Sequence, residues 1–311
     1  EMTEVVLNEP LSQVSLLFVS SALAFLALAL VLFSFQLVKL STVEAVSSEA
    51  KAASSGSIMV DEKIATDKMT ATERAGFILL WVSTAILGVG VVLRGVAAGR
   101  VPWANMYEFS ISGAFLILLV YLTALKIKDL RFIATFITGF ALITVFAAVS
   151  LFYVEVQTIM PALQSYWLVI HVVVAIMATG FLAVAAGMHI AYLLKASDRA
   201  RKLFSHFPEL LQLERIAYRF NVVGFVLWSF TLIAGAVWAE RAWHRYWGWD
   251  TKEVWTFIIW VLYAGYLHAM ATRGWNGKRA AWLGLVAFLS VIFNFTIVNL
   301  FFKGLHVYSG L

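Results

Sequence analysis

The stretch YWLVIHVVVAIMATGFLAVAAGMHIAYLL, residues 166–194, contains no Asp, Glu, Lys or Arg. At about 1.5 Å per residue, a helix of this length is longer than the ~30 Å hydrocarbon core of a bilayer. A transmembrane β-barrel would instead show strands of ~10 residues in which apolar and polar side chains alternate. Because this run is apolar throughout, it predicts a membrane-spanning helix, whose backbone hydrogen bonds are all satisfied internally.

Seven further runs have the same apolar character, and the overall composition agrees with them. Of the 311 residues, 62% are hydrophobic and only 13% are charged, which is too apolar for a soluble surface. We therefore predict an all-α integral membrane protein, a polytopic bundle of about eight transmembrane helices. The other predicted spans are residues 16–40, 75–97, 109–127, 132–154, 220–240, 254–271 and 281–301.

The basic residues predict the orientation of the bundle. Most of the 23 Lys and Arg residues fall in the first, third, fifth and seventh connections between the runs. Because Lys and Arg collect on the cytoplasmic side of membrane proteins, both termini and the even-numbered connections are expected outside. The same asymmetry accounts for the net charge of +5, so no nucleic-acid partner is expected.

Composition also divides the chain into three parts. Residues 1–40 form an N-terminal transmembrane helix rather than an ordinary signal peptide, because acidic instead of basic residues precede the apolar run. Residues 41–74, with the sequence SSEAKAASSGS, predict a flexible cytoplasmic linker, and residues 75–311 form the main membrane domain. Within that domain, residues 195–219 form either an amphipathic helix on the inner membrane surface or a solvated basic connector.

The most unusual local composition is WAERAWHRYWGWDTKEVW, residues 238–255, predicted as one outer connection. Aromatic belts at membrane interfaces are one explanation. Several rings close together in one loop, mixed with charged side chains, favour a flat aromatic platform with charged edges. Such a platform fits a large planar amphiphile with anionic groups, and haem is the candidate. The platform residues are Trp243, Trp247, Trp249 and Trp255, and the candidate partners for the haem carboxylates are Arg241, Arg245 and Lys252.

Haem iron requires axial ligands, and the absence of cysteine leaves histidine as the candidate. His171 and His306 are predicted near the outer ends of the fifth and eighth runs, on the side of the tryptophan-rich loop. His268 lies within the seventh run, about 21 Å from its outer end, where an ionisable residue marks a functional site. The alternatives are interfacial hydrogen bonds for the first two, and a bond to Tyr263 or a carbonyl for His268.

Other polar residues have simpler interpretations. His189 is expected to be a snorkelling interfacial residue, with an inner haem ligand as the alternative, and His206 a solvated one. Asp250 precedes the seventh run with Glu253 three residues later, which predicts a helix capping box rather than proton transfer. Asn105 and Glu108 are either groups supporting the site or a partner contact, or part of a solvated loop.

These segments resemble the CcsA (ResC) family, the haem-handling membrane subunits of the system II cytochrome c synthetase. WGWDTKEVW, followed by a helix ending in YLHAM, resembles the family's WWD signature. Three more segments resemble family blocks in the same order, and the resemblance covers about residues 75–310. They are VPWANMYEF (101–109), LQSYWLVIHV (163–172) and VNLFFKGLHVYSG (298–310). The sequence departs from the family at Thr251, where proline is common, and at His244, where glycine is common.

The resemblance implies a function and a set of ligands. Haem b (iron protoporphyrin IX) would be held at the outer face by His171 and His306. A second haem position in the membrane would use His268, with the opposite ligand supplied by a CcsB (ResB)-like partner subunit. The chain would deliver haem across a bacterial cytoplasmic or thylakoid membrane. There, as a subunit of a holocytochrome c synthetase, it would present haem to the Cys-x-x-Cys-His segment of apocytochrome c, whose thiols other proteins keep reduced.

Three other classes of protein remain alternatives at this point. A haem-bearing electron-transfer subunit would pair both ligands within the bundle. A system I haem-handling protein would share the WWD-like loop. A small-molecule transporter would show helix breakers in matched mid-span positions, whereas none of the four prolines lies mid-span.

Overall fold

The computed structural model of the protein describes residues 8–53, 69–157, 165–200, 202–272, 275–302 and 304–305. Within these ranges eight helices are long and apolar enough to cross a membrane, which confirms the predicted all-α membrane bundle. In chain order they are α1 (Glu9–Ala53), α3 (Ala71–Ala98), α4 (Met106–Ile127), α5 (Ala134–Leu151), α6 (Tyr166–Lys195), α7 (Leu210–Trp243), α8 (Thr251–Ala271) and α9 (Lys278–Phe293). A 3-10 turn, η1 (Arg131–Ile133), precedes α5, and a π-helix, η3 (Asn294–Val298), joins α9 to the short α10 (Asn299–Phe301).

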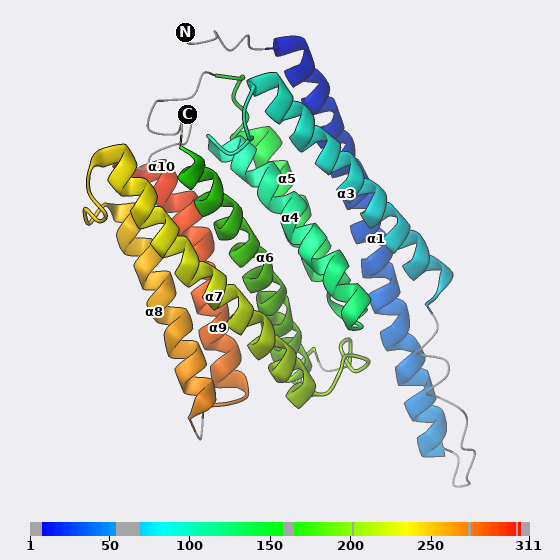
Figure 1. Ribbon diagram of the computed structural model, residues 1–311. Coiled ribbons are helices and arrows are strands. Elements are labelled where there is room, and N and C mark those ends of the chain that lie inside the picture. Colours follow the sequence, from blue (N-terminus) through cyan, green and yellow to red (C-terminus); the bar gives the residue numbers. More distant parts are fainter. Residues whose placement is uncertain are drawn as a thin grey trace.

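Neighbouring helices pack as pairs along the bundle. Figure 1 shows α1 lying along α3 at one side of the molecule, with α7, α8 and α9 at the other side and α4, α5 and α6 between them. The α3–α4 and α7–α8 connections, the start of α1 and α10 all lie at one end, which we call the loop end. Successive connections therefore alternate between the two ends, as the eight predicted spans require.

Most helices extend a few residues beyond their predicted bounds, and α1 and α7 extend furthest. The first helix continues to Ala53, because the sequence after residue 40 contains neither glycine nor proline before Gly56. Part of the segment predicted as a linker is therefore helical, and the remainder of that segment up to residue 68 lies outside the described residues. Helix α7 begins at Leu210, before the predicted residue 220.

The segment 195–219 divides into two parts: residues 210–219 are helical and belong to α7, and the described residues between α6 and α7 form a series of turns. The aromatic side chains of these turns dock on the bundle, so this part is neither an amphipathic helix nor a solvated connector. Phe204 and Phe207 are buried, and they pack against Phe136 and Phe132. His206, expected in solvent, is half-buried with its ring against Phe207. Aromatic burial thus holds this connection to η1 and α5.

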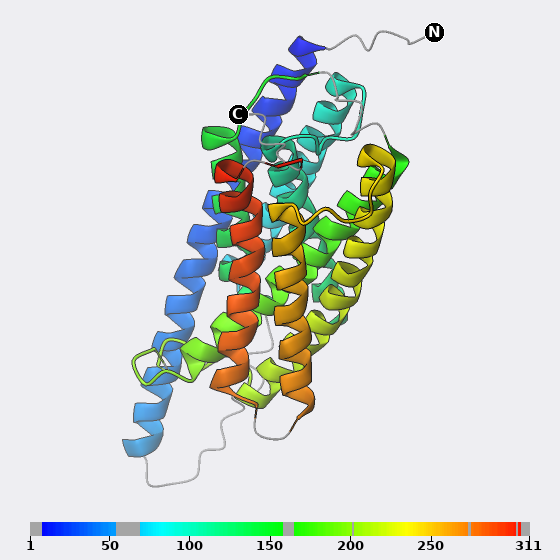
Figure 2. The ribbon, with the colours of Figure 1, turned by 90° about the vertical axis from the view of Figure 1, so that its left-hand side faces the viewer.

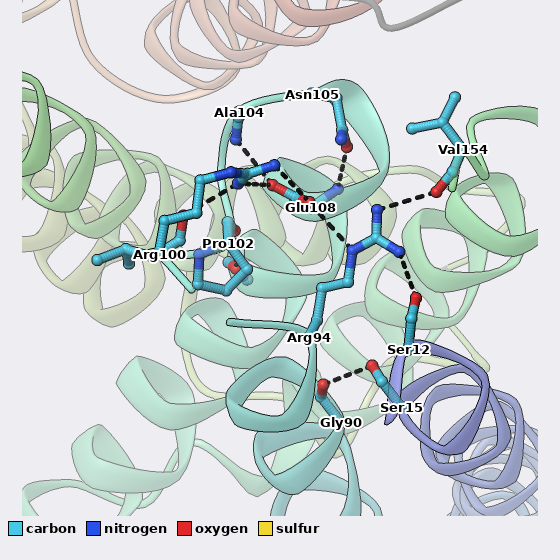
Figure 3. A network of polar contacts seen from close by, with 12 residues as sticks. Ser12, Ser15, Gly90, Arg94, Arg100, Pro102, Ala104, Asn105, Glu108 and Val154 are labelled. Atoms are coloured by element: carbon cyan, nitrogen blue, oxygen red, sulfur yellow. Dashed lines mark hydrogen bonds and ion pairs between the residues drawn. The ribbon is translucent and has the colours of Figure 1, made fainter. Parts of the chain in front are cut away.

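A buried charge network joins four parts of the chain at the loop end (Figure 3). Arg94 and Glu108 are both 0% exposed, and Arg94 Nε donates to Glu108 Oε1 at 3.0 Å. The remaining nitrogens of Arg94 donate to Ser12 Oγ and to the Val154 carbonyl, each at 2.9 Å. The network therefore ties α1, α3, α4 and the segment after α5 together.

The Glu108 carboxylate also orders the connection between α3 and α4. It accepts two further bonds from Arg100, at 2.6 and 3.1 Å, and one from the Ala104 N–H at 3.0 Å. Asn105 caps α4 by accepting the Glu108 N–H at 2.9 Å. The solvated-loop alternative for Asn105 and Glu108 is therefore wrong. Sequence patterns missed this pairing because Arg94 looks like ordinary interfacial charge.

Replacing Glu108 with Gln should destabilise the protein strongly. The substitution keeps the shape of the side chain but leaves Arg94 buried without a counter-charge, which typically costs about 3–5 kcal/mol. We expect a clearly lower midpoint of thermal unfolding in detergent. Glu155→Gln, which changes an exposed carboxylate at the same end, is the control and should shift the midpoint little. Equal midpoints for the two variants would contradict this role of Glu108.

Candidate functional site

A cavity of about 750 Å³ opens between α4 and α9 at the loop end. Its wall is mostly apolar and is supplied by α4 to α9, η3, α10, and the α3–α4 and α7–α8 connections. The polar groups in the wall include His171, Lys252 and Glu253, and Trp247 adds an aromatic face. A large apolar cavity with a few polar groups is the usual form of a cofactor site.

His171, in α6, lies in the wall of the cavity and is held by α7. Its Nδ1 lies 2.9 Å from the Thr231 carbonyl oxygen. A carbonyl only accepts, so Nδ1 must carry the proton and Nε2 keeps the lone pair that binds a metal. The ring stacks on Trp238 with centroids 6.0 Å apart and planes at 17°. A Cβ on Gly235 would lie 2.8 Å from His171 Cε1, so glycine is needed for this approach.

The tryptophan-rich segment is not one loop. Trp238 and Trp243 belong to α7 and Trp255 to α8, so only Trp247 and Trp249 lie in the connection between these helices. Figure 2 shows this connection crossing the loop end of the bundle from α7 to α8. The predicted outer connection over 238–255 is therefore shorter than the sequence suggested, because the helices continue into it.

The rings of this segment do not form the single flat surface that was predicted. Trp247 and Trp249 are perpendicular, with centroids 5.9 Å apart. Trp243 packs edge-on against Trp238, and the Trp255 ring lies 4.4 Å from Phe293. Of the four predicted platform residues, Trp247 lines the cavity, and Trp249 is 76% exposed. The segment presents rings at several angles because each follows its own helix or turn.

Helix α8 begins with the predicted capping box. Asp250 Oδ1 accepts the Lys252 N–H at 2.9 Å, and Glu253 Oε2 accepts the Asp250 N–H at 3.1 Å. Glu253 Oε2 also accepts the Gly248 N–H at 2.8 Å. The Asp250 and Glu253 side chains together fix the end of the connection relative to α8. The structural prediction for Asp250 is confirmed.

The departures from the family pattern fall at helix ends. His244 has φ 55° and ends α7, donating its N–H to the Glu240 carbonyl at 2.7 Å. This left-handed backbone favours glycine. Thr251 is the first residue of α8, a position that proline fits well. Both departures therefore affect the ends of helices and not the groups that line the cavity.

Asp250 also binds the C-terminal segment. Its Oδ2 accepts the Leu305 N–H at 2.8 Å. His306, the second predicted iron ligand, lies outside the described residues. Leu305, the residue before His306, is thus bonded to the N-cap of α8, at the same end as the cavity.

The three predicted carboxylate partners occupy different surroundings. Lys252 lines the cavity, and its Nζ donates to Asn299 Oδ1 at 2.7 Å and to the Asn294 carbonyl at 3.0 Å. Arg241 and Arg245 are not among the described residues that line the cavity. Of the three residues, Lys252 is therefore the one whose side chain lines the cavity.

The two arginines contact neighbouring side chains instead. The Arg241 guanidinium lies over the rings of Tyr166 and Trp167, 5.3 and 5.9 Å from their centroids. Arg245 packs against Gly248 within the connection. The Arg241 contacts thus join the end of α7 to the start of α6, and Arg245 lies within the connection itself.

His268 and His189 differ in their burial. His268 is exposed in the last turn of α8, away from the cavity. His189 is only 3% exposed, and its Nε2 lies 3.0 Å from Asn221 Nδ2. Its ring packs on Tyr266 and fits against Gly284, which leaves the space it needs. The expectation that His189 snorkels to the interface is therefore wrong.

Several residues of the site were not predicted from the sequence. The Thr231 carbonyl gives no pattern at all, because it belongs to an ordinary helical residue. Gly235 is a glycine inside a helix, which hints at close packing. Asn294 and Asn299 are polar residues in the apolar run VIFNFTIVNLFF. Because polar residues inside a span often mark a functional site, this pattern could have indicated them.

Comparisons with known proteins agree with these features. The family described as "Cytochrome C assembly protein" matches residues 103–306. The chain is 32% identical over 240 residues to the cytochrome c biogenesis protein CcsA of Chlamydomonas reinhardtii, covering 75% of this chain and 67% of that protein. It is 31% identical over 282 residues to CcsA of Synechococcus sp. strain CC9902, covering 81% and 93%.

Among solved structures, the fold is similar to "Cytochrome c Heme Lyase CcmF", with a TM-score of 0.65 and 16% sequence identity. The superposition covers 95% of this chain and 48% of that chain, so this protein spans about half of CcmF. At this identity the likeness shows the fold alone.

The backbone at the end of α7 predicts that His244→Gly stabilises the protein. Glycine adopts a left-handed conformation without the steric cost of about 1 kcal/mol that other residues incur. We expect a higher midpoint of thermal unfolding for the purified variant. Ala242→Gly, two residues earlier and still within α7, is the matched control. This variant should lower the midpoint, because glycine is unfavourable in a helix. A lower midpoint for both variants would contradict a strained His244.

Proposed function

The chain belongs to the CcsA family of cytochrome c assembly proteins, and on that premise we propose that it holds haem in the cavity at the loop end and presents it to apocytochrome c. The observation that carries this proposal is His171. Its proton is fixed on Nδ1 by the Thr231 carbonyl, in the wall of a large apolar cavity. A neutral imidazole with Nε2 available is the form that binds haem iron.

The described residues of the cavity fit haem b (iron protoporphyrin IX). Apolar side chains from several helices suit the porphyrin face, and Trp247 adds an aromatic surface. Lys252 supplies a positive charge for a propionate, while Arg241 and Arg245 already contact rings and backbone outside the cavity. When bound, haem supplies the vinyl groups to which the thiols of a Cys-x-x-Cys-His segment attach.

We propose His306 as the second axial ligand of the same iron. Support comes from the bond between Asp250 Oδ2 and the Leu305 N–H, which ties the residue before His306 to α8. Asp250 is thus a positioning residue rather than a proton donor. Two histidines from separate segments would hold the iron while leaving the edge of the ring accessible.

The protein's own contribution to the reaction is orientation. Trp247 at the cavity and the exposed Trp249 beside it flank the route by which a peptide reaches the site. Trp243 packs on Trp238 at the end of α7, and Trp255 packs on Phe293 at the start of α8, so both rings fix the helix ends that flank the connection. Holding two reactants in a productive arrangement is worth several orders of magnitude in rate. The chain would act as a subunit of a holocytochrome c synthetase.

We propose His268 as a ligand of a second haem position, shared with a CcsB (ResB)-like subunit. Its imidazole is exposed on the outside of α8, so an opposite ligand would come from another chain. An exposed imidazole in the last turn of α8 is accessible to a partner helix. The α7–α8 connection would then face the periplasm or the thylakoid lumen, and other proteins would keep the apocytochrome thiols reduced.

Replacing His171 or His306 with Ala should abolish holocytochrome c assembly, because each variant removes one axial ligand. Added imidazole should restore part of the activity by occupying the empty coordination position. The measurements are haem-stained c-type cytochrome in cells and the Soret band of the detergent-purified protein. His206→Ala, a histidine at the opposite end, is the control. Unchanged assembly and an unchanged Soret band in either variant would remove that histidine from the site.

Replacing His268 with Ala should deplete both haem positions if haem passes from the inner site to the outer one. The expected result is loss of haem from the purified complex and loss of cytochrome assembly, with the chain still inserted in the membrane. Haem content per complex, compared with His206→Ala, provides the measurement. Full haem occupancy at the outer site of the His268 variant would contradict sequential passage.

A further inference from the structure

The cavity has one distinctly polar end, formed by the first turn of α8 and by η3. The Lys252 ammonium has three N–H donors, and it directs two of them to Asn299 Oδ1 and the Asn294 carbonyl. Both acceptors are uncharged, so neither neutralises the ammonium. Among the described residues, one N–H donor of the ammonium therefore remains available at the cavity.

Two buried acceptors at the same end have no hydrogen-bond partner among the described residues. They are Glu253 Oε1 and Asn294 Oδ1, on residues that are 7% and 5% exposed and that both line the cavity. Glu253 Oε2, in contrast, is fully used by the Gly248 and Asp250 N–H groups. Unpaired buried acceptors are costly, so a ligand is expected to bring a donor to them.

We propose that this polar end binds one carboxyl group of haem, and that Glu253 shares a single proton with that carboxyl group while Lys252 balances the remaining negative charge. The inference rests on the proposed function and adds a specific orientation of the ring. Two carboxylates in contact cannot both be ionised in a buried site. One proton is therefore taken up from water when haem binds, and it lies between the carboxyl oxygen of haem and Glu253 Oε1.

With haem bound, the charges of Lys252, Glu253 and the haem carboxyl group balance. The two carboxyl groups with one proton carry a single negative charge, and Lys252 carries a single positive charge. The propionate and vinyl groups occupy opposite edges of protoporphyrin IX. A propionate held at Lys252 and Glu253 therefore leaves the vinyl edge, to which the thiols attach, directed away from η3.

Few other titratable groups face this end of the cavity. Those in the described wall, besides Lys252 and Glu253, are His171 from α6 and Tyr246 from the α7–α8 connection. The lining residues of α4, α5, α9 and η3 include none. Asp250 lies next to Glu253 in the chain, with its carboxylate bound to the Lys252 and Leu305 N–H groups. A proton linked to the propionate is thus attributable to Glu253 by substitution.

The test compares haem with haem dimethyl ester, which has the same iron and vinyl groups but no free carboxyl. Dissociation constants are measured from the Soret band of the purified full chain between about pH 6.5 and 8.5. For haem, we expect the dissociation constant to rise about tenfold per pH unit, because binding takes up one proton. The ester should lack this dependence, whereas any effect of the histidine ligands would be common to both compounds.

Glu253→Gln isolates the shared proton, because Gln also serves at this position of a capping box. The variant should bind haem without the pH dependence, and Glu155→Gln, at an exposed site, should behave like the wild type. Lys252→Met should weaken haem binding about tenfold or more and leave the ester unaffected. A pH dependence that is equal in the wild type and Glu253→Gln overturns the inference. Failure of both compounds to bind overturns the proposed function itself.

Discussion

The hydrogen bonds of the Asp250 carboxylate hold the functional end of the molecule together. One oxygen caps α8 through the Lys252 N–H, and the other accepts the N–H of Leu305. The start of α8, the tryptophan-bearing connection and the C-terminal segment therefore meet at one side chain. The bond to Leu305 ties the segment just before His306, the second proposed iron ligand, to the bundle. The contacts of Asp250 thus give it a structural role as the cap of α8 and the attachment point of Leu305.

A membrane protein that carries polar chemistry must satisfy its buried charges locally. At the loop end, Glu108 neutralises Arg94 and Arg100 and so stabilises the wall formed by the α3–α4 connection. Around the cavity, the polar groups are less completely paired among the described residues. The two hydrogen-bond acceptors of the Lys252 ammonium are neutral, and one oxygen of Glu253 has no hydrogen-bond partner. The first arrangement is typical of structure, and the second is typical of a binding site.

The sequence predicted the parts of this protein that depend on local patterns. Apolar runs predicted all eight spans, and the Asp250 and Glu253 spacing predicted the capping box. Features that depend on packing between helices were missed, such as the Thr231 carbonyl that orients His171 and the burial of His189 against Gly284. Ring orientations in the tryptophan-rich segment also could not be predicted, because they depend on where α7 ends and α8 begins.

The proposed binding of one iron by His171 and His306 in the cavity at the loop end is tested most directly by an experimental density map of the haem-loaded protein with its proposed partner subunit. We expect the iron between His171 Nε2 and the His306 imidazole, with the ring under the α7–α8 connection. Haem bound elsewhere, with His171 Nε2 uncoordinated and the cavity filled by side chains, would contradict it.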